Sequence, residues 1–258
     1  MSTGKLAMGV LCALGLGLAS LGCDAGGSDG EGSAETGAGP GDTGGTSGET
    51  GDETGTPGDE IVIEPANMID DLEDGDPLIL AADGRQGAWY TYNDESEGAE
   101  QLPPTPFEPT SGGPGSSLYM AQTSGSGFGV WGAGVGIDLN NEGDPDGGDG
   151  MRMPYDASGH QGIVFHGRGN TGIRVKLLTA AIVPTETGGT CETECEDAHG
   201  MSIPLTDEWQ QFTVPFDGAF QEGWGTAASF DASTMMSVQF QVAAGIDFEY
   251  ELDQIGFY

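Results

Sequence analysis

Apolar residues in this chain come in short stretches, many alternating with polar residues, and Gly- or Pro-rich segments separate the stretches. Alternation on every second residue is typical of strands with one buried face, whereas no stretch keeps the spacing of an amphipathic helix. We expect strands within residues 61–63, 67–76, 78–80, 88–92, 118–121, 129–139, 162–168, 173–179, 209–216, 235–242 and 247–258. Short strands without long helices predict an all-β fold, a β-sandwich or jelly roll.

The last of these stretches contains a slip in its alternation. Phe248, Tyr250 and Leu252 are apolar on every second residue, but the next apolar residues are Ile255 and Phe257. A shift of one position turns the later side chains to the other face unless an extra residue bulges out of the strand. The slip therefore predicts a β-bulge at residues 253–254.

Residues 1–23 predict export. Lys5 precedes an apolar stretch, residues 6–21, which is too short and too rich in Gly for a membrane span and is typical of a secretory signal peptide. It ends in Ala-Ser-Leu-Gly-Cys, which resembles the lipobox of bacterial lipoproteins and implies acylation of Cys23. The usual lipobox has Leu three residues before the cysteine, so an ordinary cleavable signal is the alternative. We expect a protein that is exported and lipid-anchored to the cell envelope, at the outer membrane, facing the periplasm or the cell surface.

Residues 24–60 predict a linker. They contain thirteen glycines and ten acidic residues, with no aromatic residue and no apolar residue larger than Ala among the rest. Such a segment buries too little apolar surface to offset the loss of chain entropy on folding. We expect a disordered, charge-extended linker here, followed by one domain over residues 61–258.

The charge of the chain limits its partners. It has 42 acidic residues against 6 Lys and Arg, which gives a formal net charge of −36. This excess excludes binding to nucleic acid or to an anionic membrane surface through charge, and it favours cations.

Acidic residues are crowded at 67–76, where Asp70, Asp71, Glu73 and Asp74 lie within five positions. Carboxylates this close repel one another unless a cation or solvent relieves the repulsion. Two interpretations stay open: a bound cation, with Ca²⁺ favoured, or a solvated acidic edge without a site.

Three short motifs carry a resemblance to a known family. They are Met-Ile-Asp-Asp-Leu-Glu at 68–73, Trp-Gln-Gln-Phe-Thr-Val-Pro-Phe at 209–216 and Phe-Glu-Tyr-Glu-Leu-Asp-Gln-Ile at 248–255. Together they resemble galactose-binding-like β-sandwiches, in particular family 11 carbohydrate-binding modules and the domains of complex I intermediate-associated proteins. The likeness spans residues 61–258, with insertions at 93–117 and 184–199, and it implies a jelly-roll sandwich.

The resemblance also implies a structural Ca²⁺ between the first and last strands. Transferred onto this sequence, the ligands are Glu73 and Asp253, with Asp71 as a third. Where the family often has two acidic residues before the last apolar pair, this chain has Asp253 followed by Gln254, so one acid is missing.

Candidate ligand-binding residues follow from the chemistry of sugar recognition, in which flat rings stack on sugar faces and planar polar groups bond the hydroxyls. Alternation places Tyr90 and Tyr92 on one face of their strand and Trp89 on the other, and one of these faces must be core. The resemblance to family 11 modules implies an aromatic-rich sugar cleft to which the 235–242 strand contributes. This strand lacks Tyr and Trp, which weakens the case for a glucan. The candidates are Arg85, Trp89, Tyr90, Tyr92, Trp131, Trp224, Gln239 and Gln241.

Cys191 and Cys195 are spaced as Cys-x3-Cys and are followed by His199. In an exported protein we expect a disulfide between the two cysteines. A zinc site is the alternative, although two thiols and one imidazole are an incomplete ligand set. A second acidic cluster, at Asp144, Asp146 and Asp149, resembles a calcium loop only loosely, and a mobile acidic loop is the favoured interpretation.

No motif for a serine hydrolase or a zinc protease is present, although acidic residues suited to a glycosidase are abundant. The sequence therefore predicts a monomeric, non-catalytic carbohydrate-binding domain that binds a polysaccharide or glycan, is stabilised by Ca²⁺ and is tethered to a membrane by its lipid anchor. The alternatives are an envelope module for structure or protein interaction and, less favoured, a polysaccharide-active enzyme.

Overall fold

The computed structural model describes residues 60–141 and 151–258. The predicted signal peptide, Cys23 and nearly all of the predicted linker lie outside the described residues, as do Asp144, Asp146 and Asp149. Within the described ranges, no helix is long and apolar enough to cross a membrane.

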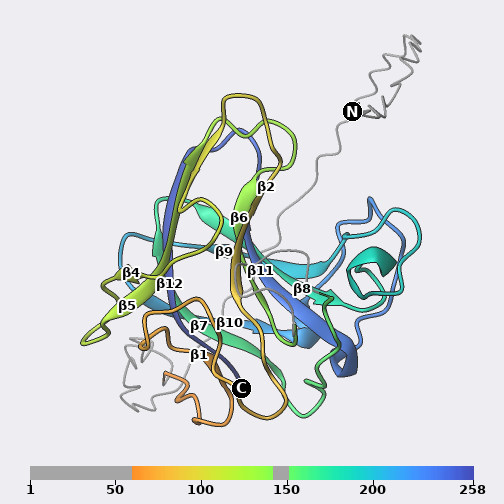
Figure 1. Ribbon diagram of the computed structural model, residues 1–258, viewed down its shortest axis with the longest axis horizontal. Coiled ribbons are helices and arrows are strands. Elements are labelled where there is room, and N and C mark those ends of the chain that lie inside the picture. Colours follow the sequence, from red (N-terminus) through yellow and green to blue (C-terminus); the bar gives the residue numbers. More distant parts are fainter. Residues whose placement is uncertain (1–59, 142–150) are drawn as a thin grey trace, which may run out of the picture. The chain divides into compact units, whose positions relative to one another are not determined.

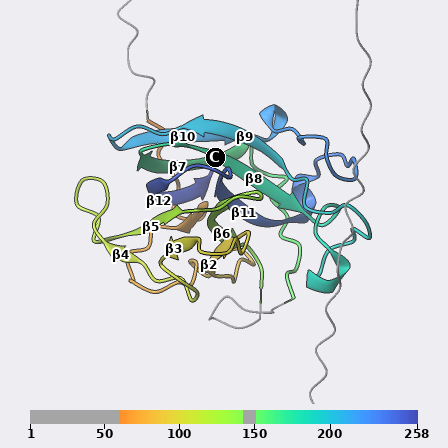
Figure 2. The same ribbon diagram turned by 90° about the horizontal axis from the view of Figure 1, so that it is seen from above.

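In the described part of the chain, the strands form two sheets in which neighbouring strands are antiparallel (Figures 1 and 2). One sheet has the order β10-β7-β12-β5-β3, with β1 beside β12 and β4 beside β5. Its strands are β1 (Met68–Asp70), β3 (Glu100–Leu102), β4 (Thr110–Ser111), β5 (Tyr119–Ser126), β7 (Gly162–Gly169), β10 (Gln210–Pro215) and β12 (Phe248–Phe257). The other sheet has the order β2-β6-β11-β8-β9. Its strands are β2 (Trp89–Asn93), β6 (Ala133–Asp138), β8 (Gly172–Thr179), β9 (His199–Pro204) and β11 (Met235–Val242).

The chain crosses repeatedly from one sheet to the other, as from β5 to β6, β7 and β8, so the predicted all-β sandwich with jelly-roll connections is confirmed. Among the described residues, three short 3-10 helices interrupt the connections: Thr185–Thr187, Phe216–Gly218 and Ala232–Thr234.

Alternation along the strands builds the core between the sheets. In β11, Val238 and Phe240 are fully buried in the core, while the residues between them face the opposite side. Val175 of β8 and Phe165 of β7 meet them in the same cluster. Each sheet therefore gives one face to the core and keeps the other for solvent or a ligand.

Some predicted strands are wrong in detail. Residues 61–63 are no strand, and there the backbone of Ile61 bonds the side chain of Gln211, whose Oε1 accepts from Ile61 N and whose Nε2 donates to Ile61 O. At 78–80 only an isolated bridge from Leu78 to Ala88 forms. Strands β3, β4 and β9 were not expected, because the first two are short pieces of a Pro-rich segment and β9 contains Gly and Ser.

The predicted bulge is confirmed. The pairing of β12 with β7 shifts between Asp253 and Gly256, and Gln254 has a positive φ of 49°. On its other side β12 pairs with β1, where Met68 lies opposite Gly256. The first strand and the last are therefore neighbours, and the bulge lies beside their seam.

Candidate functional site

A cleft of about 1370 Å³ lies over the face of the β2-β6-β11-β8-β9 sheet that points away from the core. Its floor comes from the strands, and its rim comes from loops that contain Val130, Trp131, Glu222, Trp224 and Ile246. The volume exceeds the range of about 300–1,000 Å³ that is usual for small-molecule pockets. The cleft therefore has room for a ligand longer than a single small molecule.

The register of the sheet arranges the floor in two parallel rows. The first row contains Tyr92 of β2, Gly134 of β6, Gln241 of β11 and Arg174 of β8, each opposite the next. The second row, two residues along each strand, repeats the same types with Tyr90, Gly136, Gln239 and Lys176. Each row therefore presents an aromatic ring, a gap, an amide and a cation.

The glycine in the second row makes room for its aromatic ring. A Cβ on Gly136 would lie 2.4 Å from Tyr90 Cζ, so any larger residue there would push the ring out of place. The Tyr90 hydroxyl lies 2.7 Å from Ser237 Oγ and accepts a hydrogen bond from Gln239 Nε2 over 2.9 Å. Burial raises the pKa of Tyr90 to about 12, so the phenol is neutral and serves as a fixed part of the floor.

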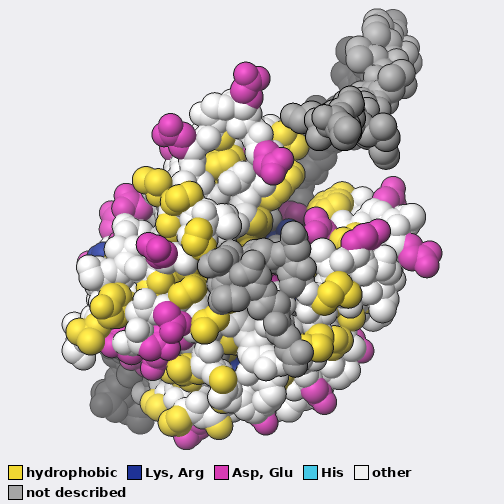
Figure 3. Space-filling view, viewed as in Figure 1, with side chains coloured by type: hydrophobic (Ala, Val, Ile, Leu, Met, Phe, Trp, Pro, Cys, Tyr) yellow, Lys and Arg dark blue, Asp and Glu magenta, His cyan; other side chains and the backbone are white. Residues whose placement is uncertain are grey.

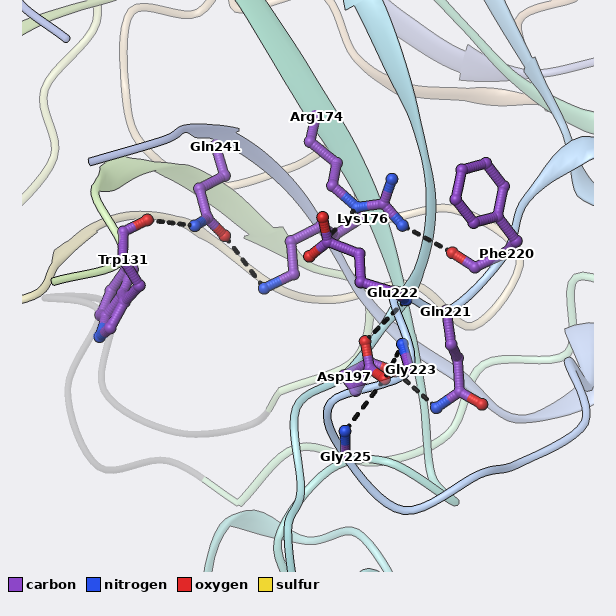
Figure 4. Close-up of polar contacts among 10 residues, drawn as sticks. All are labelled: Trp131, Arg174, Lys176, Asp197, Phe220, Gln221, Glu222, Gly223, Gly225 and Gln241. Carbon is purple, nitrogen blue, oxygen red and sulfur yellow. Dashed lines mark hydrogen bonds and ion pairs between the residues drawn. The ribbon is translucent and has the colours of Figure 1, made fainter. Parts of the chain in front are cut away.

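The first row is tied to the rim through Gln241 (Figure 4). Its Nε2 donates to the backbone oxygen of Trp131 over 2.7 Å, and its Oε1 accepts from Lys176 Nζ over 3.0 Å. Burial lowers the pKa of Lys176, which is half-buried in the floor. This chain of bonds holds an amide and an ammonium group side by side under the first rim loop.

Arg174 connects the floor to the opposite part of the rim (Figure 4). Its Nη2 donates to the Phe220 backbone oxygen over 2.6 Å, and its guanidinium carbon lies 4.9 Å from the centre of the Phe220 ring. Glu222 Oε2 lies 3.9 Å from Arg174 Nε. The planar guanidinium is thereby oriented on the cleft floor by an aromatic face and a carbonyl group.

Two indoles stand exposed at the rim. Trp131 is 43% exposed and stacks on Tyr92 with a centroid distance of 5.8 Å, and Trp224 is 55% exposed. Contiguous exposed apolar surface that is rimmed by polar residues marks ligand-binding grooves and interaction sites. The rim therefore offers two flat apolar surfaces beside a polar floor.

Six of the eight candidate ligand-binding residues predicted from the sequence line this cleft: Tyr90, Tyr92, Trp131, Trp224, Gln239 and Gln241. The interpretation of Trp89 was wrong, since it is 1% exposed, stacks on Phe107 and donates from Nε1 to Asp70. The interpretation of Arg85 was wrong as well. This guanidinium is buried, and it donates to the Tyr155 hydroxyl and to the backbone oxygens of Ala66 and Met68.

Sequence reasoning missed three cations of the cleft, Arg152, Arg174 and Lys176. They are half of the six Lys and Arg residues of the chain, and Figure 3 shows acidic side chains spread over one face where Lys and Arg appear at only a few points. The signal was available in β8, where Arg174 and Lys176 alternate with buried Ile173 and Val175. Cations on the exposed face of a strand in so acidic a chain indicate a site.

The seam between β1 and β12 contains the residues predicted to hold Ca²⁺. Ser117 Oγ donates to Glu73 Oε1 over 2.6 Å, and Leu118 N donates to the same oxygen over 2.9 Å. Asp253 also lies beside Ser117; its Oδ2 is buried without a hydrogen-bond partner, and burial raises its pKa to about 6. A Cβ on Gly113 would lie 2.6 Å from that oxygen, so the glycine keeps the space around it open.

These residues fit a hard cation, because an orphaned carboxylate oxygen beside a second carboxylate and a hydroxyl group is the kind of donor set that Ca²⁺ takes. The described residues hold no group of three or more His, Cys, Asp or Glu side chains placed to bind a metal. Asp71 accepts a hydrogen bond from Glu73 N at 3.3 Å through its Oδ1. Glu73 and Asp253 are thus the pair around which a cation would be completed by other oxygens.

The predicted disulfide is confirmed. Cys191 and Cys195 are bonded, with Cα atoms 5.7 Å apart. The alternative of a zinc site with His199 is wrong, because both sulfur atoms are used in the disulfide and neither is free as a thiolate.

Comparison with known proteins gives relatives of partial length and low similarity. No family model matches the chain. It is 28% identical over 180 residues to Endoglucanase 3 from Fibrobacter succinogenes (strain ATCC 19169 / S85), which covers 67% of this chain and 24% of that protein. The chain therefore spans about a quarter of the length of the curated relative that it matches.

Solved structures that it resembles include family 11 and other carbohydrate-binding modules, the family that the sequence motifs resemble, as well as an exo-β-agarase. A family 11 module from Clostridium thermocellum in complex with a β-1,3-1,4-mixed-linked tetrasaccharide is 17% identical, with 74% of this chain and 94% of that chain covered and a TM-score of 0.48. A family 11 module of a cellulosomal cellulase from the same organism is 16% identical, with 74% and 92% covered and a TM-score of 0.46. At such low values these likenesses carry no argument about what this chain binds.

Proposed function

We propose that this chain is a non-catalytic carbohydrate-binding domain whose ligand lies in the cleft over the β2-β6-β11-β8-β9 sheet. The observation that carries the proposal is the combination of two exposed indoles at the rim with two rows of amides and cations on the floor. Sugar rings have apolar faces that stack on indoles and hydroxyl groups that bond planar polar side chains. A cleft with both kinds of group suits an oligosaccharide better than it suits an apolar or a purely ionic ligand.

The similarity to Endoglucanase 3 supports a polysaccharide as the ligand. Endoglucanase 3 is similar to this chain over most of the chain's length. The shared part is a minority of that protein, so its enzymatic activity is not carried over. We take a glucan as the first ligand class to test.

A glycan array and affinity electrophoresis in glucan-containing gels test the proposal with the Trp131→Ala and Trp224→Ala variants. Each variant is expected to weaken binding by about tenfold or more, as for truncation of a central aromatic contact. Trp209→Ala is the matched control, because Trp209 is partly exposed but packs against Arg168 of the other sheet. Its affinity is expected to equal that of the unmodified chain. An unmodified chain that binds no glycan would favour the alternative of a protein-interaction module.

The non-catalytic part has its own test. Glu196 and Glu222 are carboxylates that line the cleft, and a glycosidase needs two such groups. We expect no release of reducing sugar from soluble glucans by the unmodified chain. Release that disappears in Glu196→Gln or Glu222→Gln would make the protein an enzyme.

We propose further that a Ca²⁺ ion bridges Glu73 and Asp253 at the seam of β1 and β12, supported by the buried orphan oxygen of Asp253. There the ion would neutralise two carboxylates and join the first strand to the last. Its role is structural, since these side chains do not line the cleft.

We also propose that acylated Cys23 anchors the protein to the envelope, on the strength of the Ala-Ser-Leu-Gly-Cys motif. Metabolic labelling with a fatty acid in a bacterial host is expected to label the chain and place it in the membrane fraction. A Cys23→Ser variant is expected to lose both the label and the membrane association. Equal labelling of the two chains would remove the anchor from the proposal.

A further inference from the structure

Each of the two rim loops that present a tryptophan is folded around the carboxylate of a single aspartate. Asp94 follows β2 and holds the first loop. Its Oδ2 accepts from the backbone nitrogens of Val130, Trp131 and Gly132 over 2.8, 2.9 and 2.9 Å. One oxygen atom thus fixes three consecutive peptide groups, with the indole on the middle one.

Asp197 precedes β9 and holds the second loop in the same way (Figure 4). Its Oδ1 accepts from Glu222 N over 2.9 Å, and its Oδ2 accepts from Gly223 N and Gly225 N over 2.8 and 3.1 Å. The side chain is 2% exposed. Trp224 lies between the glycines whose nitrogens are held.

The two loops stand at opposite edges of the sheet that forms the floor. Trp131 stacks on Tyr92 of edge strand β2, whereas the loop of Trp224 bonds a carboxylate beside edge strand β9. A ligand that crosses the strands from β2 to β9 would meet one indole at each edge.

We propose that Asp94 and Asp197 are positioning residues, which hold the rim loops so that the indoles of Trp131 and Trp224 stand ready as stacking platforms before a ligand binds. The inference rests on the proposed function and deepens it, because it assigns the rigidity of the cleft to two side chains that do not line it. Ordering a loop on binding costs affinity, so a loop that is ordered in advance binds more tightly.

The ionisation of both carboxylates agrees with this role. Burial opposes their charge, yet hydrogen bonds outweigh it and lower both pKa values: from Ser96 and the loop nitrogens for Asp94, and from the loop nitrogens for Asp197. Bonds to an ionised acceptor are about twice as strong as neutral ones. Both loops are therefore held by charge-assisted bonds at neutral pH.

Other contacts are consistent with loops that are built to stay in place. Gln241 Nε2 bonds the backbone oxygen of Trp131 from the floor, over 2.7 Å. In the second loop, Thr226 Oγ1 donates to Thr193 O over 2.6 Å, within the ring closed by Cys191 and Cys195. The disulfide therefore steadies the segment from which Asp197 extends.

The first test needs no ligand. Acrylamide quenching of tryptophan fluorescence is measured in chains with Trp209→Phe and either Trp131→Phe or Trp224→Phe, so that one exposed indole remains beside buried Trp89. We expect Asp197→Ala to raise the quenching constant of Trp224 about twofold and to leave that of Trp131 unchanged. Asp94→Ala is expected to do the reverse. Equal quenching constants with and without each aspartate would overturn the proposal.

The second test is a pair of double-mutant cycles on affinity for cellohexaose. If Asp197 acts through Trp224, Asp197→Ala weakens binding about two- to tenfold alone and has no further effect once Trp224 is Ala. Combined with Trp131→Ala, the same change is expected to add fully. Asp94→Ala should show the mirror pattern, coupled to Trp131 and additive with Trp224→Ala. Additive effects of Asp197→Ala and Trp224→Ala, or of Asp94→Ala and Trp131→Ala, would contradict the positioning role.

Two further measurements separate the possible failures. Asp197→Asn and Asp94→Asn keep one acceptor oxygen and are expected to restore part of the affinity; if an Ala variant does not fold, the Asn variant takes its place in both tests. Loss of binding in the Trp→Ala variants but not in the Asp variants would sink the positioning proposal alone. Absence of glycan binding by the unmodified chain would sink the proposed function, while the quenching test would still decide on the loops.

Discussion

The aspartates at the rim of the cleft and those at the seam of β1 and β12 have pKa values that are shifted in opposite directions. At the rim, Asp197 accepts three backbone N–H groups, and its pKa is lowered. At the seam, burial raises the pKa of Asp70 to about 7 and that of Asp253 to about 6. Exposure does not explain the contrast, since Asp197 is 2% exposed and Asp253 is 0% exposed.

The number of donors explains it. Burial alone disfavours the charged form, and several N–H donors can outweigh that effect, as at Asp197. Asp253 accepts from Gln254 N through Oδ1 but leaves Oδ2 without a partner, so its carboxylate is incompletely satisfied. The chain itself supplies several donors to the rim carboxylates, whereas it leaves one oxygen of Asp253 at the seam without a hydrogen-bond partner. The first arrangement underlies the proposed positioning of the rim loops, and the second supports the proposed Ca²⁺.

The largest expected effect is the stabilisation of the seam by Ca²⁺. Adding Ca²⁺ at a hundred times its Kd is expected to stabilise the fold by about 2.7 kcal/mol. For a domain of this size that raises Tm by roughly 5–10 °C, measured by calorimetry with Ca²⁺ against EDTA. Glu73→Gln with Asp253→Asn is expected to abolish the rise, and the rim variant Asp94→Asn is expected to keep it. Identical Tm values with Ca²⁺ and EDTA would contradict a cation at the seam.

The next effect concerns the second rim loop and its disulfide. Replacing Cys191 and Cys195 by Ser removes the closure of a short ring and is expected to cost about 2 kcal/mol in the chain-entropy model. Urea unfolding measures the loss. Because Asp197 extends from this segment, quenching of Trp224 should increase while quenching of Trp131 stays constant. A change in the quenching of both Trp131 and Trp224 would show that the two rim loops are not independent.

Acid is expected to loosen the rim. A carboxylate whose folded pKa is depressed contributes stability that is fully present above its unfolded pKa, near 3.8, and is lost as pH falls further. Acrylamide quenching of Trp131 and Trp224 should therefore be flat above about pH 5 and rise below about pH 4. In Asp94→Asn with Asp197→Asn the rise should disappear. A rise that persists in the double variant would assign the acid effect to other carboxylates.

The smallest expected effects come from removing single hydrogen bonds in the two rim loops. Thr226→Val removes the bond to Thr193 O, and Ser96→Ala removes the acceptor of Gly129 N in the first loop. Each change is expected to lower the free energy of unfolding, measured in urea, by about 0.5–1.5 kcal/mol. Thr226→Val is expected to mobilise only Trp224, and Ser96→Ala only Trp131. An effect of either change on the opposite indole would show coupling through the floor.

Much of the cleft was predictable from the local sequence pattern. The two residues that this pattern wrongly included show where such a prediction fails. Tyr90 and Tyr92 were assigned to a common face because alternation leaves no other choice. Which face was core could not be known from that strand alone, and so Trp89 was wrongly included. Arg85 failed for a similar reason, because a buried guanidinium that bonds backbone oxygens of a distant segment looks like any surface cation in the sequence.

The sequence by itself determined the all-β fold, the faces of the long strands, the slip at Asp253 and the disulfide, since each depends on residues that are near one another in the chain or on a fixed period of two. Only the tertiary structure decided that β2, β11 and β8 stand in register, so that Tyr92, Gln241 and Arg174 form one row. It alone brought Asp94 to the nitrogens near Trp131 and Asp197 to those near Trp224. These contacts join segments about 30 residues apart, and they form because a carboxylate enclosed by the fold must find donors wherever the packing supplies them.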